Sequence, residues 1–373
     1  MNDDHVTFRL PQAILDAFCS EMLQAADMPP EDALLVAHSL SEADARGLGS
    51  HGVVRLLPVY LRRLQAGTTR ARPNISVLRR RGAIAVLNGD AGLGQVVGHA
   101  AMRLATAAAR EFGIGAVAVR HSSHFGIGAL FAEQAVAEGM VGIVMANAPS
   151  NMPPHGGRGR FFGTNPLAVG LPCGAERPVV LDMSTSVVAR GKIVMLQKLG
   201  LPIPLGWAID SEGNPTEDAG AALAGAVLPM AGYKGSGLAL VIDALCGVLA
   251  GAAFGPHIVD LYNEGDQPQN VGHFFMALDV ETFLSLAQFR EQMDQLVREV
   301  RAQPRQPGVE RIYVPGEWEY ELAERSQCEG VPLPAAGVRE LDELACRLKI
   351  VPLSERMRNA VSGGAAGMPA QKG

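Results

Sequence analysis

The sequence has few cysteines, and their positions exclude two common uses of this residue. Cys19, Cys173, Cys246, Cys328 and Cys346 are scattered along the chain, are odd in number and form no CxxC pair. A disulfide framework needs an even set with regular spacing, and a structural zinc site needs paired ligands. We therefore expect reduced thiols, a reducing compartment and no bound metal.

The chain also lacks an excess of positive charge. It has 32 Lys and Arg against 38 Asp and Glu, a formal net charge of −6, and no basic run longer than Arg79–Arg81. Proteins that bind nucleic acids carry a basic footprint for the phosphates. The composition therefore predicts no nucleic-acid partner.

Long hydrophobic runs are missing as well. The acidic start at residues 1–5 is not followed by an apolar segment, so we expect no secretory signal. The most apolar stretch, residues 237–254, is barely long enough to span a bilayer and carries Asp243. A charge at mid-span would cost about 2.5–3.5 kcal/mol on insertion scales. We predict a buried helix there, no membrane partner and a soluble, cytoplasmic protein.

Glycine, in contrast, is abundant, at 43 of 373 residues. The glycines follow no fixed period, which excludes collagen and simple solenoids. They gather in short polar islands between apolar runs, where positive φ angles or close backbone approach are useful. This distribution favours an enzyme or a ligand-binding protein with functional loops on a scaffold.

The periodicity of apolar residues indicates a mixed fold. Helical spacing dominates before about residue 75, and from residue 76 short apolar runs alternate with helical stretches. Predicted strands lie at 83–87, 114–119, 141–146, 166–171 and 179–182. Predicted helices cover two segments within 9–48, then 55–65, 96–112, 125–138, 187–199, 238–250, 287–301 and 338–348. The sequence thus predicts an α/β (α+β) protein with a helical N-terminal region.

Two glycine patterns approach a Rossmann fingerprint without matching it. Residues 113–118 fit G-x-G-x-x-A, but they follow a predicted helix and lead into a strand, which reverses the required order. Residues 92–98 follow a strand and open a helix but contain one residue too many. No Walker A sequence is present. If the chain binds a nucleotide, we expect it to do so without a standard Rossmann turn.

Ser50-His51-Gly52 lies at a glycine-flanked junction between two predicted helices, and Arg55 follows four residues after the histidine. On a helix this spacing puts both side chains on one face. Arginine binds carboxylates through paired hydrogen bonds, and histidine exchanges protons near neutral pH. The motif fits proton transfer on a carboxylate substrate. The structural alternative makes Ser50 a helix cap and His51 a surface residue.

Further polar islands follow predicted strands or precede helices, where α/β proteins bind ligands. They comprise residues 121–126, 153–157, 162–166, 182–186 and 232–237. Helix capping is the alternative for 121–126 and for Asp182, and a flexible turn is the alternative for 232–237. Residues 313–317 are interpreted as a strand and a turn with a structural role. His121 and His124 lack a third ligand at metal-binding spacing.

In chain order, these islands resemble one family, the malate/L-lactate dehydrogenase (type 2) family of NAD(P)-dependent oxidoreductases, over about residues 10–350. The matching motifs are Ser50-His51-Gly52 with Arg55, Ser123-His124-Phe125-Gly126, Gly163-Thr164-Asn165-Pro166, Asp182-Met183-Ser184-Thr185-Ser186, Ala189-Arg190-Gly191-Lys192, Gly206-Trp207-Ala208-Ile209-Asp210, Lys234-Gly235, Asn270-Val271-Gly272-His273-Phe274 and Pro315-Gly316-Glu317. Each motif is weak alone, but nine in the family's order are specific.

The resemblance implies a homodimer whose nucleotide-binding domain is not a Rossmann fold and has a large mixed, largely antiparallel sheet. It implies a helical region at 1–75 that is completed by C-terminal helices at about 285–355. The sheet domain would comprise 76–120 and 165–284, with a smaller α/β segment carrying active-site loops at 121–164. A disordered tail is expected at 360–373.

The resemblance also implies chemistry and residue roles. Family members transfer a hydride between a nicotinamide coenzyme and C2 of a small 2-hydroxy or 2-oxo acid. Here His51 would be the acid/base with Ser50 beside it, His124 would be a second acid/base candidate, and Arg55 and Thr164 would bind the substrate. The coenzyme would be NAD, with NADP as the alternative, and no metal is implied. It would be lined by His124, Phe125, Gly126, Ile127, Gly128, Asp182, Met183, Ser184, Lys234, Gly235, Pro315, Gly316 and Glu317.

Two alternatives stay open. One branch of the family reduces cyclic imines, pyrroline- and piperideine-2-carboxylate, and its members tend to carry an acidic residue where this chain has Lys192. That difference favours a 2-hydroxy acid. A cofactor-binding homologue without catalysis is the alternative of another class, and the intact His51, Arg55 and Asp182 argue against it.

Overall fold

The computed structural model describes residues 7–262 and 267–358. These residues fall into two compact units, the first within 1–66 and 319–373 and the second within 67–318. The tail predicted at 360–373 lies outside the described residues.

The first unit is mainly helical and is built from both ends of the chain. Its elements are β1 (Thr7–Leu10), α1 (Gln12–Gln24), α2 (Pro30–Ala45), the 3-10 turn η2 (Gly49–His51), α3 (Val53–Gln65), β11 (Val331–Pro334) and α11 (Ala335–Arg347). Pro30 at the first turn and the acids that follow it, Glu31 and Asp32, favour the start of α2 at this point. β1 and β11 pair antiparallel, with Leu10 opposite Val331, so the two ends of the chain are joined by a ladder.

The second unit contains a seven-stranded sheet. In space the strand order is β2-β3-β4-β10-β5-β6-β7. Only β3 and β4 run parallel, and the other neighbours are antiparallel. The strands are β2 (Ser76–Arg81), β3 (Ile84–Asn88), β4 (Ile114–Ser122), β5 (Met140–Ala146), β6 (Leu167–Leu171), β7 (Val179–Met183) and β10 (Val271–Asp279). The predicted mixed α/β fold class is confirmed, whereas the central strand β10 was not predicted.

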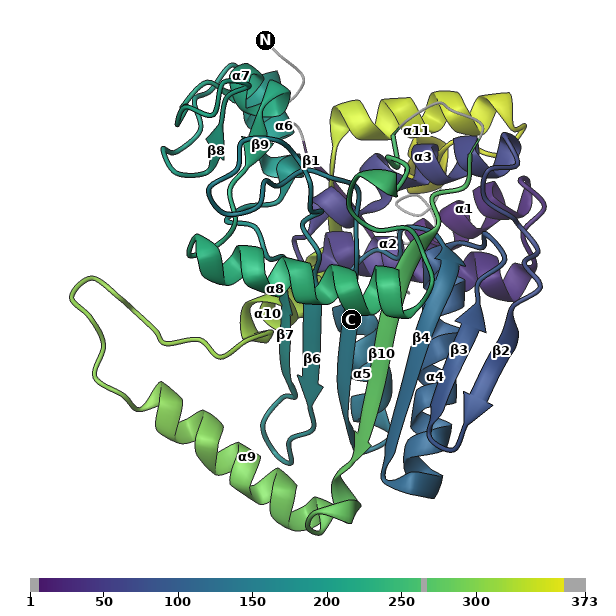
Figure 1. Ribbon diagram of the computed structural model, residues 1–373. Coiled ribbons are helices and arrows are strands. Elements are labelled where there is room, and N and C mark those ends of the chain that lie inside the picture. The colour runs from purple at the N-terminus through teal and green to yellow at the C-terminus, as the bar shows by residue number, and fades with distance from the viewer. Residues whose placement is uncertain (1–6, 263–266, 359–373) are drawn as a thin grey trace, which may run out of the picture. The chain divides into compact units, whose positions relative to one another are not determined.

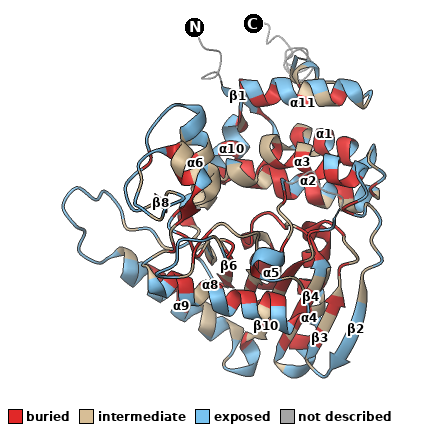
Figure 2. Cartoon of the chain, turned by 45° about the horizontal axis from the view of Figure 1, so that its top comes forward, coloured by how far each residue is buried: buried red, intermediate tan, exposed pale blue. Residues whose placement is uncertain are grey.

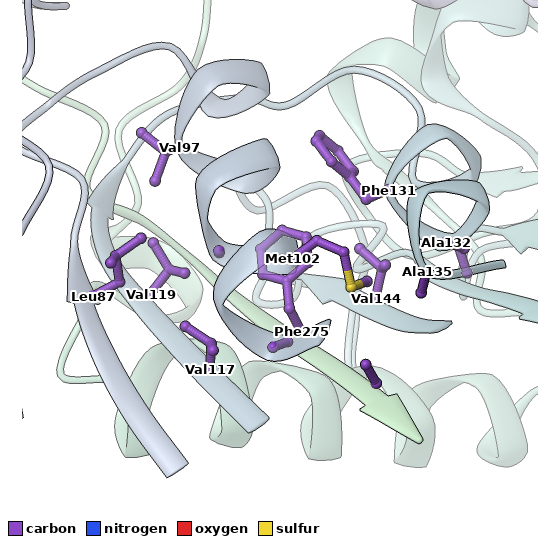
Figure 3. Close-up of a cluster of buried hydrophobic side chains, with 14 of the residues drawn as sticks. Leu87, Val97, Met102, Val117, Val119, Phe131, Ala132, Ala135, Val144 and Phe275 are labelled. Atoms are coloured by element: carbon purple, nitrogen blue, oxygen red, sulfur yellow. The ribbon is translucent and has the colours of Figure 1, made fainter. Parts of the chain in front are cut away.

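Helices α4 (Gly94–Phe112) and α5 (Ala129–Ala137) cover one face of this sheet, behind the strands in Figure 1. Met102 from α4, Phe131 from α5 and Phe275 from β10 meet in the core (Figure 3). The Phe131 and Phe275 rings lie edge to face at 5.5 Å. Burying a side chain of this size stabilises the fold by about 1.5–3 kcal/mol. The edge strand β2 is largely exposed (Figure 2).

Helix α8 (Tyr233–Asp243) and the π-helical turn η3 (Ala244–Leu249) cross the other face, in front of the strands in Figure 1. Ala239, Ile242 and Cys246 are buried here. The outer side is exposed, at 55% for Leu240, 50% for Val241, 64% for Val248 and 62% for Leu249. The prediction of a buried helix is therefore wrong for this side, because only one side of the helix packs on the sheet. Among the described residues no helix is long and apolar enough to cross a membrane.

A small lobe with its own core extends from the sheet in the second unit. It contains α6 (Arg190–Lys198), β8 (Ala208–Ile209), α7 (Ala219–Ala224) and β9 (Ala226–Val227). The two strands pair antiparallel, and the core gathers around Ile193 and Ile203. We predicted the smaller α/β segment at 121–164 instead. That segment includes β5, which lies inside the large sheet.

The remaining elements are η4 (Gly255–His257), η5 (Val280–Thr282), α9 (Leu286–Arg301) and α10 (Glu317–Glu329). Helix α9 belongs to the second unit, whereas we expected it to complete the helical region. The reason is local. The Asp294 carboxylate accepts hydrogen bonds from the backbone N–H groups of Gly174, Ala175 and Glu176, and Met293 packs against Cys173.

Candidate active site

Strand β7 links three of the segments predicted to bind coenzyme or substrate. The Val180 N–H donates to the carbonyl of Pro315 at 3.1 Å. Just beyond the strand, Thr185 donates to the carbonyl of Thr164 from its backbone N–H at 2.9 Å and from its hydroxyl at 3.0 Å. The end of β7 therefore joins the Pro315–Glu317 turn to the Thr164 loop.

The start of α8 lies against the same strand end. The Met230 N–H donates to the carbonyl of Thr185, and the Gly235 N–H donates to the carbonyl of Met230, both at 3.0 Å. A Cβ atom at Gly235 would lie 2.4 Å from the Met230 oxygen and 2.6 Å from the Thr185 oxygen. Only glycine fits so close an approach. Lys234 beside it is exposed.

Asp182 connects β7 to the segment that follows His124. One oxygen of its carboxylate accepts the Ala129 N–H at 2.9 Å, where α5 begins. The other oxygen lies 3.4 Å from the position that a Cβ atom of Gly128 would occupy. Of the alternatives for Asp182, capping is observed, but the helix it caps comes from another part of the chain. Met183 and Ser184 complete the strand end.

The Glu317 side chain is buried, so it is not available as an exposed contact to a ligand. Its side chain is only 4% exposed; it pairs with Arg301 at 3.0 Å and with Arg311, and it accepts the Val314 N–H at 3.0 Å. The carboxylate thus shapes the turn at Pro315 and Gly316. Residues 313–314, predicted as a strand, form no ladder.

The His124 loop packs against the start of α4. The Ser123 hydroxyl accepts the Gly94 N–H at 3.2 Å and donates to the Gly92 carbonyl at 3.0 Å. A Cβ atom at Gly94 would lie 2.3 Å from the Ser123 carbonyl oxygen. The glycines of this near-Rossmann pattern therefore allow helix and loop to meet, and the Gly94 N–H is engaged by protein.

The imidazole of His124 has a defined internal partner. Its Nδ1 accepts the N–H of Gly126 at 3.4 Å, which places the ring proton of the neutral form on Nε2. His121, the other histidine of this loop, has a left-handed φ of 52° and meets Asn88 Oδ1 at 2.9 Å. Within residues 7–262 and 267–358 no three His, Cys, Asp or Glu side chains are grouped as a metal site.

Ser50, His51 and Arg55 belong to the first unit. His51 ends η2, and its Nδ1 lies 3.0 Å from the Ser50 hydroxyl. Arg55 lies in the first turn of α3. Burial lowers the pKa of His51 to about 4, and the positive charge of Arg55 adds to this shift. His51 is therefore neutral at pH 7 and can accept a proton.

Asp44 is a residue of this region that the sequence analysis missed. It lies on α2, is 7% exposed, and accepts the Val53 N–H at 2.7 Å where α3 begins. A Cβ atom at Gly52 would lie 1.8 Å from its carboxylate, so the glycine of Ser50-His51-Gly52 makes room for Asp44. The sequence does contain one sign of this role. Asp44 follows Leu40 by four residues, so it lies in the apolar stripe of the predicted helix, where an aspartate is unusual.

Burial raises the pKa of Asp44 to about 7, and the hydrogen bond from Val53 opposes this shift. The folded state thus holds the proton more tightly than the unfolded chain, whose aspartate titrates near 3.8. The stability contributed by this group is present below pH 4 and falls as the pH rises from about 4 to 7.

We expect Asp44→Asn, which keeps an acceptor for Val53 and removes the ionisation, to change this pH dependence. The variant should gain stability over the wild type by about 1.4 kcal/mol per pH unit within that window. Urea titrations between about pH 4 and 8 measure the free energy of unfolding. A difference in the free energy of unfolding that stays constant with pH would contradict the account. Asp44→Ala removes the hydrogen bond to the Val53 N–H and should lower the free energy of unfolding by about 1–2 kcal/mol.

Comparison with known proteins gives a consistent result. The profile of the malate/L-lactate dehydrogenase family matches residues 10–342. Malate dehydrogenase from Pyrococcus horikoshii is 38% identical over 355 residues, which cover 93% of this chain and 97% of that protein. Its solved structure aligns with a TM-score of 0.86 at 37% identity, covering 94% of this chain and 98% of the other.

Two further relatives carry their coenzyme in their names. The (2R)-3-sulfolactate dehydrogenase (NADP(+)) of Chromohalobacter salexigens is 35% identical and covers 86% of this chain and 92% of its own. The ureidoglycolate dehydrogenase (NAD(+)) of Escherichia coli is 33% identical, covering 87% and 92%. Among solved structures, delta1-piperideine-2-carboxylate reductase from Pseudomonas syringae aligns with a TM-score of 0.81 at 29% identity, covering 91% of this chain and all of that one.

Proposed function

The chain belongs to the malate/L-lactate dehydrogenase family, and on that premise we propose that it transfers a hydride between a nicotinamide coenzyme and C2 of a small 2-hydroxy or 2-oxo acid. The observation that carries the proposal is the shared chemistry of its relatives. Malate, sulfolactate and ureidoglycolate are all 2-hydroxy acids, and dehydrogenases named for each align with most of this chain.

We propose that Arg55 binds the substrate carboxylate and His51 exchanges the proton of the reacting hydroxyl. In the oxidation direction, neutral His51 accepts this proton as the hydride leaves C2. Ser50 orients the imidazole through Nδ1. A carboxylate on Arg55 would offset the positive charge that now lowers the pKa of His51. Substrate binding thus makes the histidine a stronger base.

His124 is the second proposed acid/base, and Thr164 the second substrate contact. Both lie in the second unit, in the segments joined at β7 and α5. We propose that the strand-end group, comprising 124–128, 182–184, 234–235 and the 315–317 turn, lines the coenzyme, with Glu317 contributing by shaping that turn. When bound, the nicotinamide supplies the hydride acceptor or donor. Lys234 is exposed and precedes Gly235, where no Cβ atom fits. Its positive charge suits the anionic diphosphate of the coenzyme.

NAD is our expected coenzyme, with NADP as the alternative, since relatives are named for each. The cyclic-imine reductase remains the second candidate function, because a piperideine-2-carboxylate reductase shares the fold. Lys192, at the third position of α6, follows Arg190-Gly191 and favours the hydroxy acid. A cytoplasmic location stays a prediction.

The first test is oxidation of NADH or NADPH at 340 nm with a panel of 2-oxo acids and pyrroline-2-carboxylate. We expect turnover of at least one oxo acid, and the better coenzyme then identifies the cofactor. Turnover of the imine alone would overturn the hydroxy-acid proposal. NADH binding without turnover of any compound would favour the non-catalytic homologue.

The electrostatic pairing of Arg55 with His51 gives a second test. Replacing Arg55 by Gln removes the charge that lowers the histidine pKa, so the acid limb of kcat/KM for oxidation should move to higher pH. KM for the 2-hydroxy acid should rise at least tenfold because the carboxylate loses its paired hydrogen bonds. The exposed Arg62 on the same helix provides the control, Arg62→Gln. A pH profile of Arg55→Gln that matches the wild type would contradict this role.

His51→Ala should lower kcat by about 10²–10⁴ while NADH still binds. NADH fluorescence measures binding, and steady-state kinetics measure kcat. If His124→Ala produces this loss and His51→Ala does not, His124 is the acid/base.

We also propose that the chain forms a homodimer, as the family resemblance implies. The outer side of α8 and η3 supports this, because Leu240, Val241, Val248 and Leu249 are all at least 50% exposed. Contiguous apolar surface of this kind is uncommon on monomers and favours a second copy of the chain as its partner.

Sedimentation should therefore give twice the chain mass of 39.3 kDa. Val248→Glu should shift the protein to monomers, because a carboxylate would be desolvated in the interface. Leu34, also exposed at 52% but in the first unit, provides the control Leu34→Glu. A dimer that tolerates Val248→Glu would place the interface elsewhere.

A further inference from the structure

Residues 269–273, which lead into β10 and include its first residues, run alongside the loop that carries His124. The His121 N–H donates to Asn270 Oδ1 at 2.9 Å, and the His124 N–H donates to Gln269 Oε1 at 3.1 Å. Both His121 and Asn270 adopt left-handed φ angles of 52°. Strained backbone of this kind persists where surrounding contacts fix it.

His273 holds the residues on either side of Ser123 and His124. Its Nε2 lies 2.8 Å from the Ser122 hydroxyl. Its ring stacks on that of Phe125, with centroids 4.9 Å apart and planes 1° from parallel. His273 is fully buried, and Ser122 and Phe125 are 1% and 4% exposed. The loop is thus held at four points, residues 121, 122, 124 and 125, by a single short segment.

The Ser122–His273 pair resembles a nucleophile and its base, but its burial assigns it a different role. Neither group is exposed to a substrate. Burial also lowers the pKa of His273 to about 3, so the ring stays neutral at physiological pH. A neutral ring keeps both its hydrogen bond and its stacking. His273 therefore acts as a constant support for the loop.

Gln269 has the most direct contact with His124. The side chain is 1% exposed, and its Nε2 donates to the Val259 carbonyl at 3.2 Å. The amide is thereby held at both ends, with Oε1 presented to the His124 N–H. Because Nδ1 of His124 is engaged by Gly126, the orientation of the imidazole depends on where the His124 backbone lies.

We propose that Gln269 is a positioning residue for His124, and that His273 holds the adjacent Phe125 in the same way. The inference rests on the proposed function, which gives His124 a role at the coenzyme and the reacting proton. Gln269 touches neither substrate nor coenzyme in this account. It fixes the backbone from which the imidazole projects, 145 residues away in sequence.

A double-mutant cycle tests the proposal. Gln269→Met keeps the length of the side chain and removes the acceptor, so kcat should fall by about 10- to 100-fold through misplacement of His124. In the His124→Ala background the same substitution should change kcat less than twofold, since the group it positions is absent. Equal losses in both backgrounds would overturn the proposal.

Val144→Ala provides the control for a purely structural effect. Val144 lies on β5, outside the loop, and is 1% exposed in the hydrophobic cluster that also contains Phe125. The variant should lower the melting temperature. Any effect that it has on kcat should be the same in the wild-type and His124→Ala backgrounds. If Val144→Ala reproduces the kcat loss and the same dependence on His124, the effect of Gln269 is general destabilisation and the proposal fails.

An NMR measurement separates this proposal from the proposed function. The ring signal of His124 is identified by its absence in His124→Ala, in protein labelled at histidine. Gln269→Met should shift or broaden that signal, and Val144→Ala should not. If the signal moves but His124→Ala alters neither kcat nor NADH binding, the positioning stands and the role of His124 fails. An unmoved signal overturns the positioning itself.

Discussion

The insertion of β10 between β4 and β5 is the arrangement on which the second unit depends. A strand that follows both neighbours in sequence by more than a hundred residues completes the ladder between them. The same strand supplies Phe275 to the core under α4 and α5, and its start supplies the contacts to the His124 loop. The pairing of β10 with β4 and β5 therefore supports both the core packing and the geometry of the site. A shift in the register of β10 would disturb both.

A second principle recurs in both units: a polar side chain from one element, buried in the case of Asp44 and Gln269, fixes the backbone of another. Asp44 holds the start of α3 after His51, Asp182 holds the start of α5 after His124, and Gln269 holds the His124 backbone. Gly52 allows the close approach that the Asp44 contact needs. Polar groups buried with their hydrogen bonds satisfied restrict a loop to one conformation, which is what a site for hydride transfer requires.

Local sequence predicted the elements that have strong local signals. The long helices α4 and α9 were found within two residues at each end, because their apolar periodicity and caps are local properties. β10 was missed because nothing in residues 271–279 tells which strands will flank it. Helix α5 was predicted from residue 125 but begins at Ala129, since Gln269 and His273 hold the preceding residues in a loop. Gln269 escaped notice for the same reason, because its role arises from a contact that no spacing rule encodes. Asp44 was marked only by its place in the apolar stripe of α2, which does not show that it contacts Val53. The motifs identified the family, but only the three-dimensional contacts show which residues support them.

The central claim is direct hydride transfer between nicotinamide and C2 of a small acid. It is tested most directly by isotope transfer, with NADH or NADPH deuterated at the reactive C4 position and a 2-oxo acid turned over by the enzyme. The account predicts a single deuterium at C2 of the 2-hydroxy acid product, detected by mass spectrometry and located by NMR. A product without deuterium at C2, or deuterium found only in solvent water, would contradict it.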